Sequence, residues 1–174
     1  SNVYALVGEG VAALWSVDAS AWVGSFSRLE GGKGYWLIAT NDFSFSFSAG
    51  DGLTRAELPR EVPAVYSYSQ SDQQAFYFVN SATIGGEPLE NEDLIIAYNG
   101  DVVVGSRYWN GKLTDVPAIG VDTEGGEIYD GYCDYGDKVS FKVLDASTGE
   151  LLEMDVDGDI NWIHMNMSLI NLTD

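Results

Sequence analysis

Six acidic residues lie close together in a glycine-rich part of the chain, and their side chains are of the type that binds calcium. They are Asp122, Glu124, Glu127, Asp130, Asp134 and Asp137. Ca²⁺ prefers oxygen ligands, and two or three of these carboxylates converging with backbone carbonyls would form an ordinary structural site. The alternative is a solvated acidic loop, because the spacing of acids alone is a weak signal. We therefore expect any bound calcium to lie within residues 122–137.

Aromatic side chains offer a second kind of candidate site. Tyr108 and Trp109 end an apolar stretch that we expect to form a hairpin, and three further tryptophans lie early in the chain, at Trp15, Trp22 and Trp36. An exposed tryptophan or tyrosine ring has an apolar face that can stack on a sugar, so this set suggests a carbohydrate-binding surface. The alternative is packing in the core, where large aromatic side chains of β proteins usually lie.

The residue types that most enzyme mechanisms need are scarce. His164 is the single histidine and lies in an alternating, strand-like run, where we expect a structural role. Cys133 is the single cysteine, and the neighbouring Asp134 disfavours a reactive thiolate. The sequence contains no nucleophile elbow, phosphate-binding loop or zinc cluster. A glycosidase needs only two carboxylates, but nothing singles out one pair, and we expect a non-catalytic protein.

The segment "EMDVDGDINW", residues 153–162, is acidic enough to suggest a calcium loop of the EF-hand type. Such a loop needs glycine at its sixth position and a helix after it, whereas Gly158 is fourth and strand-like sequence lies on both sides. A hairpin fits better. A three-residue loop at 157–159 would pair Val156 with Ile160 and Met154 with Trp162, and would keep one face apolar.

The overall composition narrows the class of protein. The 174 residues contain 27 acidic and 8 basic side chains, which gives a formal charge of −19. Such a surface repels phosphate backbones and anionic lipid, so we expect no nucleic-acid partner. No apolar run reaches about 18 residues, so we expect no membrane insertion. A single cysteine allows no disulfide within the chain.

The pattern along the chain predicts an all-β protein. We expect a small β unit at residues 1–49, a linker at 50–62 and an antiparallel β-sandwich, Ig-like or jelly-roll-like, at 63–174. The alternating "FSFSFS" at 43–48 predicts a strand. Asn99 and Gly100 predict a two-residue hairpin loop, with Ala97 facing Val102 and apolar residues on both faces. Residues 110–137 read as a long irregular segment, and 20 of the 27 acids follow residue 62.

The closing run "INWIHMNMSLINL", residues 160–172, predicts one long terminal strand. Its candidate assembly residues alternate along the run and are Ile163, Met165, Met167 and Leu169. If this strand lay at a sheet edge, it could pair with the open edge of another subunit. The alternative is an ordinary strand paired within its own chain.

Two stretches of the sequence resemble a known kind of module. "DLIIAYNGDVVVGSRYW" and "GYCDYGDKVSFKVLDASTGE" are similar to a pair of hairpins in a module that recurs in secreted and cell-surface proteins of marine and Bacteroidetes-like bacteria. "GEGVAALWSVDASAWVGSFSRLEGGKGYWL" is similar to a unit found beside that module. The resemblance implies a non-catalytic extracellular module of a multi-domain protein, exported by a type nine secretion route. It implies no ligand and no catalytic residue.

Two functions from different classes follow as expectations. The first is a structural or adhesive extracellular module that assembles with copies of itself or with neighbouring domains. The second is a calcium-stabilised carbohydrate-binding module that uses Tyr108 and Trp109. Residues 122–137 would hold its Ca²⁺, and glycans would be its partners.

Overall fold

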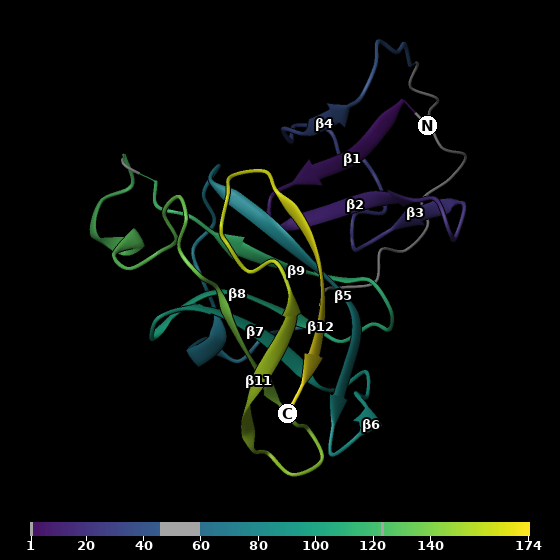
Figure 1. The fold of residues 1–174 in the computed structure, drawn as a ribbon. Coiled ribbons are helices and arrows are strands. Elements are labelled where there is room, and N and C mark those ends of the chain that lie inside the picture. Colours follow the sequence, from purple (N-terminus) through teal and green to yellow (C-terminus); the bar gives the residue numbers. More distant parts are fainter. Residues whose placement is uncertain (1, 46–59, 123) are drawn as a thin grey trace.

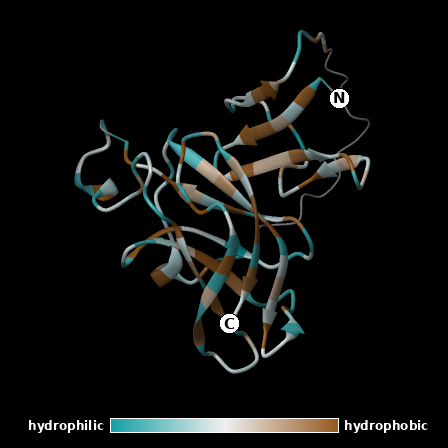
Figure 2. Ribbon diagram, in the orientation of Figure 1, coloured by the Kyte–Doolittle hydropathy of each residue, from teal (hydrophilic) through white to brown (hydrophobic). Residues whose placement is uncertain are grey.

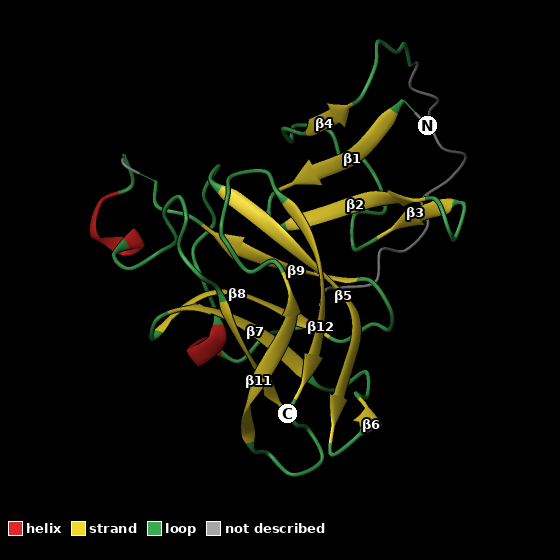
Figure 3. Ribbon diagram, in the orientation of Figure 1, coloured by secondary structure: helices red, strands yellow, loops and turns green. Residues whose placement is uncertain are grey.

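The computed structural model describes residues 2–45, 60–122 and 124–174, and it confirms the all-β class. Two sheets make up the described chain, joined by loops and two short 3₁₀ turns, η1 (Ala64–Tyr66) and η2 (Gly126–Tyr129) (Figures 1 and 3). Over these residues no helix has the length and apolar character needed to cross a membrane.

Sheet A is antiparallel and has the strand order β3-β2-β1-β4. Its strands are β1 (Val3–Gly8), β2 (Val11–Ser16), β3 (Ala21–Val23) and β4 (Trp36–Ala39). The β1–β2 connection is a two-residue turn in which Gly10 takes φ +63°, a value that glycine adopts without strain. Side chains alternate between the two faces, and both faces are apolar because these strands are rich in Val, Leu, Ala and Trp.

The second sheet is larger and curled, with the strand order β6-β5-β12-β11-β10-β7-β8 and with β9 paired to β5. Its strands are β5 (Gln74–Ile84), β6 (Glu87–Pro88), β7 (Leu94–Asn99), β8 (Val102–Tyr108), β9 (Thr114–Ile119), β10 (Ser140–Leu144), β11 (Leu151–Gly158) and β12 (Met167–Thr173). All pairs are antiparallel except β5 with β12. The parallel pair makes this a mixed sheet, a departure from the antiparallel sandwich that the sequence suggested.

The curl of the second sheet brings β8 over β9 and encloses the main core. Gly105 of β8 lies directly against Pro117 of β9, so close that a Cβ at position 105 would overlap the Pro117 carbonyl. Inside the curl, the rings of Tyr77 and Phe141 meet edge to face at 5.2 Å, and Trp162 is buried nearby in the same core. The outer side of β7 is covered as well, by residues that include Tyr66 of η1. The expectation that the β7–β8 hairpin is apolar on both faces is therefore confirmed.

Sheet A packs through its inner face on β5 of the curled sheet. Val7 and Ala12 contact the buried rings of Phe76 and Phe78. The predicted linker at 50–62 lies mostly outside the described residues, although Val62 packs beside β7.

The predicted register of the Asn99-Gly100 hairpin is wrong. The loop residues are Gly100 and Asp101, and Asn99 pairs with Val102 within the ladder. The Asn99 amide instead donates hydrogen bonds to the carbonyls of Gly131 and Tyr132 at 3.1 and 3.3 Å. A bulge then makes Val104 an extra residue, so that Ala97 faces Gly105 rather than Val102. This shift places Gly105, the glycine of β8, against Pro117 of β9.

The hairpin predicted at residues 157–159 is also wrong. Val156 pairs with Leu172 of β12, not with Ile160, and the chain forms a longer loop between β11 and β12. A tertiary contact of Trp162 explains why this hairpin does not form. Trp162 is drawn into the main core, where its indole Nε1 donates to the Ala118 carbonyl at 2.9 Å.

Two further strand predictions need correction. Residues 110–137 are not irregular throughout, because they contain the buried strand β9. Its Asp115 and Pro117 are residue types that are rare in buried strands, so the sequence pattern did not indicate a strand there. The strand expected at 43–48 is not formed over residues 43–45, and the rest of that run lies outside the described residues.

Candidate binding groove

The outer face of sheet A presents apolar side chains to solvent. Register fixes which residues share this face: Leu6 of β1 lies opposite Leu37 of β4, while Trp22 of β3 lies opposite Trp15 of β2. Figure 2 shows brown, apolar strands in this sheet at the end of the molecule away from the C-terminus. Trp22 and Leu37 keep 39% and 37% of their surface exposed, which is unusual for large apolar residues that lie close together.

A groove of about 410 Å³ runs along this face. It is lined by Asn2, Val3, Leu6, Trp22, Leu37, Phe43, Ser44 and Phe45. The rings of Phe43 and Phe45 are stacked, 5.7 Å apart and inclined by 21°, and both are exposed. Trp22 is held in place by an edge-to-face contact with Trp15 at 5.6 Å. The groove thus presents several aromatic rings at the surface.

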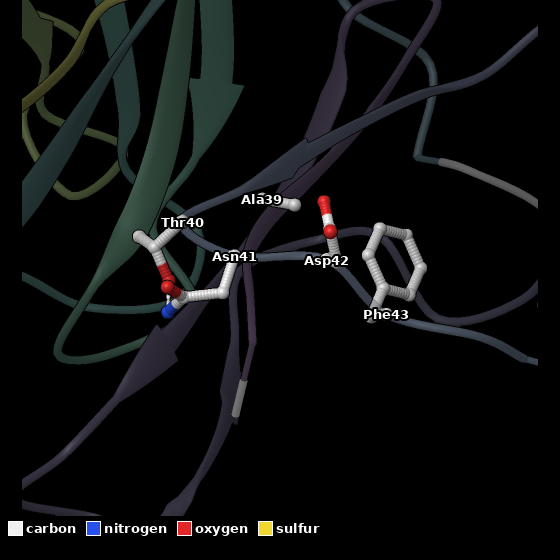
Figure 4. A pocket seen from close by; sticks show the side chains of 5 residues that line it. All are labelled: Ala39, Thr40, Asn41, Asp42 and Phe43. Carbon is white, nitrogen blue, oxygen red and sulfur yellow. Dashed lines mark hydrogen bonds between the residues drawn. The ribbon is translucent and has the colours of Figure 1, made fainter.

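A polar loop adjoins the groove. It forms an open pocket of about 510 Å³ lined by Ala39, Thr40, Asn41, Asp42 and Phe43. In Figure 4 the side chains of Asp42 and Phe43 point to the same side of the loop, whereas Thr40 and Asn41 lie together elsewhere, joined by a 3.3 Å hydrogen bond. The Asn2 amide anchors the loop by donating to the Asp42 carbonyl at 3.1 Å. Carboxylate and amide groups therefore border the aromatic rings.

Buried polar residues of the curled sheet hold sheet A in position. Gln74 is fully buried, and its amide donates to the Gly8 carbonyl while its oxygen accepts from the Gly10 N–H. Arg107 donates to the Gly10 carbonyl and lies 3.6 Å from the Asp115 carboxylate. These contacts fix the β1–β2 turn.

Asp115 is the centre of this polar connection. Its carboxylate accepts hydrogen bonds from the Ala12 N–H at 3.1 Å, the Ser25 N–H at 2.7 Å and the Ser25 hydroxyl at 2.6 Å. Burial raises the pKa of Asp115, and the Arg107 guanidinium and these donors act in the opposite direction. We name this set the Asp115 latch: Gln74, Arg107 and Asp115, with their partners on sheet A.

The six acids at residues 122–137 do not gather around one point. Asp122 caps its own turn by accepting from the Glu124 N–H, and Asp134 accepts from the Tyr135 N–H. Asp137 is bound by the Asn99 amide and the Asp134 N–H. Among the described residues, no three His, Cys, Asp or Glu side chains are placed to hold one metal ion. Calcium binding stays a prediction.

Of the predicted aromatic pair, Trp109 is buried and Tyr108 is half-buried. Trp109 is 8% exposed and belongs to the main core. Tyr108 is half-buried, with the Arg60 guanidinium 4.6 Å from its ring centre and its hydroxyl donating to the Glu61 carbonyl. Burial of Trp109 and the Arg60 guanidinium over the Tyr108 ring leave less aromatic surface for sugar stacking than the sequence suggested. The exposed rings of sheet A are better placed for that role.

The terminal strand predicted at residues 160–172 forms only from residue 167 on, as β12, which lies within the sheet, and Ile163 and Met165 lie in the loop before it. β12 pairs with β5 along its whole length, and with β11 from Ile170 to Thr173. Met165 and Met167 pack towards the Phe76 and Phe78 cluster, whereas Ile163 and Leu169 are exposed. The four side chains therefore do not form one docking face, and the in-chain alternative describes this strand better.

The two residues considered for nucleophilic chemistry differ in their exposure to solvent. Cys133 is buried, and burial raises its thiol pKa to about 12, with Asp137 adding to the effect. The exposed His164 ring accepts a hydrogen bond from the Gln74 N–H at its Nδ1. The raised thiol pKa agrees with the expectation of an unreactive Cys133, whereas the structural role of His164 stays a prediction.

Comparisons with known proteins do not assign this chain to a family. No protein-family model matches it, and searches of curated proteins and of solved structures gave no significant match. The class of protein that the fold and site define is an all-β protein with an aromatic groove on its smaller sheet.

Proposed function

We propose that this chain is a non-catalytic structural or adhesive module of an extracellular protein, and that it contacts its partners through sheet A. The observation that carries the proposal is the exposed aromatic groove formed by Trp22, Leu37 and Phe43. Exposed apolar patches rimmed by polar groups are typical of protein interaction sites. The resemblance to modules of secreted bacterial surface proteins supports the extracellular setting and export by a type nine route.

The distribution of charge supports the same surface. Residues 1–45 carry four acidic and two basic side chains, so nearly all of the −19 charge belongs to the rest of the chain. The acidic part repels other acidic molecules and keeps the protein soluble. Sheet A, nearly neutral and apolar on its outer face, is where a partner can approach with little repulsion.

A surface-adhesion measurement tests this function. The double variant Trp22→Ser/Phe43→Ser removes two groove rings that are not in the main core. We expect its affinity for a surface coated with alkyl chains to fall by at least about tenfold, the factor that corresponds to about 1.4 kcal/mol. The matched variant Leu151→Ser/Leu169→Ser changes two exposed residues of the curled sheet and should bind as the parent chain does. Equal binding by all three proteins would contradict the proposal.

Carbohydrate binding is a second candidate, favoured by one observation. The polar loop places the Asp42 carboxylate beside the Phe43 ring at the border of the groove (Figure 4). Aromatic stacking combined with a few convergent polar groups is the usual chemistry of small-ligand sites. A glycan array should then show binding of neutral sugars that both Asp42→Ala and Trp22→Ala abolish, whereas Trp109→Ala would act only through stability. Absence of binding to every neutral glycan would leave adhesion to protein as the function.

A further inference from the structure

The edges of the two sheets differ in how they are protected against pairing with another chain. In the curled sheet, β6 is two residues long and consists of a charged residue and a proline, Glu87 and Pro88. β8 is covered by β9, where Gly105 meets Pro117, and β9 itself carries a proline that cannot donate to a ladder. Shortness, charge, proline and coverage are the usual protections of sheet edges.

Strand β4 of sheet A is short, at four residues, but within the described residues it lacks the other three protections. It pairs with β1 on one side and, within the described residues, with no strand on the other. Residues 34–41, "GYWLIATN", contain neither a charged residue nor a proline. Trp36 and Leu37 are each more than a third exposed. An exposed apolar edge of this kind presents unpaired backbone N–H and C=O groups to any extended segment that reaches it.

The charge of the molecule favours a second copy of this chain as the occupant. β4 lies at the outer margin of sheet A, away from the curled sheet that holds most of the acids (Figure 1). Two copies meeting at β4 would therefore keep their acidic parts far apart relative to the screening length, which is about 8 Å at physiological ionic strength. An acidic partner meeting any other part of the surface would be repelled.

We infer that β4 pairs antiparallel with β4 of a second copy to form a two-fold dimer. The inference rests on the proposed function, because it specifies how this module assembles. Antiparallel pairing of identical edges is self-complementary, as a two-fold interface requires. The two sheets A become one continuous sheet. Their outer faces lie on the same side of it, so the two aromatic grooves form one longer apolar surface.

Sedimentation velocity over the micromolar to millimolar range tests the dimer. Trp36→Lys places a charge at the edge, on the face opposite the groove, and should weaken dimerisation at least about tenfold. The matched control Leu169→Lys introduces the same charge on exposed β12 and should dimerise as the parent chain does. Raising the ionic strength should strengthen the dimer, because it screens the repulsion between two acidic chains.

Hydrogen exchange provides a second measurement that does not depend on how a variant folds. The backbone amides of residues 36–39 should become more protected as the concentration of the parent protein rises. A parent chain that stays monomeric at all concentrations, or a dimer that Leu169→Lys destroys and Trp36→Lys does not, would overturn the inference. Because Trp36 does not line the groove, Trp36→Lys should still adhere to alkyl surfaces. Loss of the dimer with adhesion retained separates this inference from the proposed function.

Discussion

At the scale of single residues, the Asp115 carboxylate is the side chain on which the arrangement of the two sheets most depends. It is 2% exposed and accepts hydrogen bonds from Ala12 of β2 and from Ser25, which lies just after β3. A buried carboxylate is costly unless such donors surround it, so its partners must be present for the fold to tolerate it. The position of the groove therefore depends on a residue that lies outside sheet A.

Replacement of Asp115 should destabilise the protein strongly. Asp115→Ala leaves the Ala12 N–H, the Ser25 N–H and the Arg107 guanidinium without their partner, and removing one member of a buried charge pair costs about 3–5 kcal/mol. Chemical denaturation followed by tryptophan fluorescence measures this loss. Asp18→Ala, at an exposed acid in the β2–β3 turn of sheet A, is the control and should change the free energy of unfolding by less than about 0.5 kcal/mol. Similar effects from the two variants would show that the latch contributes little.

At the scale of elements, the crossing of β8 over β9 decides how the curled sheet closes. The bulge at Val104 and the glycine at position 105 let the two backbones approach more closely than side chains would allow. Arg107 then reaches over β9 and donates from its Nε to the Asp115 carbonyl at 3.0 Å. The crossing of β8 over β9 closes the main core and also positions Arg107 of the Asp115 latch next to sheet A.

A methyl group at position 105 should disrupt this crossing. Gly105→Ala forces Cβ into the Pro117 carbonyl, a backbone group that cannot move without shifting β9. Overpacking of this kind costs about 3 kcal/mol, the upper end of the usual range. Thermal unfolding compares this variant with Gly31→Ala, where nothing lies within 4 Å of the new Cβ. An unfolding temperature of Gly105→Ala equal to that of the parent protein would contradict the close approach of β8 and β9.

At the scale of the whole molecule, charge is distributed unevenly between the two sheets. The acids concentrate after residue 62, while the apolar groove lies in the nearly neutral first part of the chain. Self-repulsion among the acids opposes the compact state, and dissolved cations relieve it. Dissolved salt should therefore stabilise the folded protein.

Stability should rise with ionic strength for this reason. Between about 10 mM and about 0.15 M NaCl the screening length falls from about 30 to about 8 Å, and the temperature of unfolding should increase. CaCl₂ and MgCl₂ at matched ionic strength serve as the comparison. A further increase with calcium alone would support a specific site at residues 122–137. An unfolding temperature that did not change with NaCl would contradict the screening argument.

The sequence by itself determined the class of fold and the separation of charge along the chain. These properties depend on local alternation and on composition, and both can be read along a single chain. Val139, Phe141 and Val143 alternate in the sequence, and all three side chains are buried in the structure, in β10 or just before it. The same local logic predicted an unreactive Cys133, and its raised thiol pKa agrees with that prediction.

Only the tertiary structure decided the register of the hairpins, the buried position of Trp109 and the location of the groove. Local turn rules favoured Asn99-Gly100 and residues 157–159. Contacts between residues distant in sequence outweigh these local preferences. Gly105 packs against Pro117, and the Trp162 indole donates a hydrogen bond to the Ala118 carbonyl. Trp109 and Trp22 are equally hydrophobic, yet one is buried and the other is exposed. Alternation assigns a residue to a face of a strand, but only the packing of one sheet on another decides which face meets solvent.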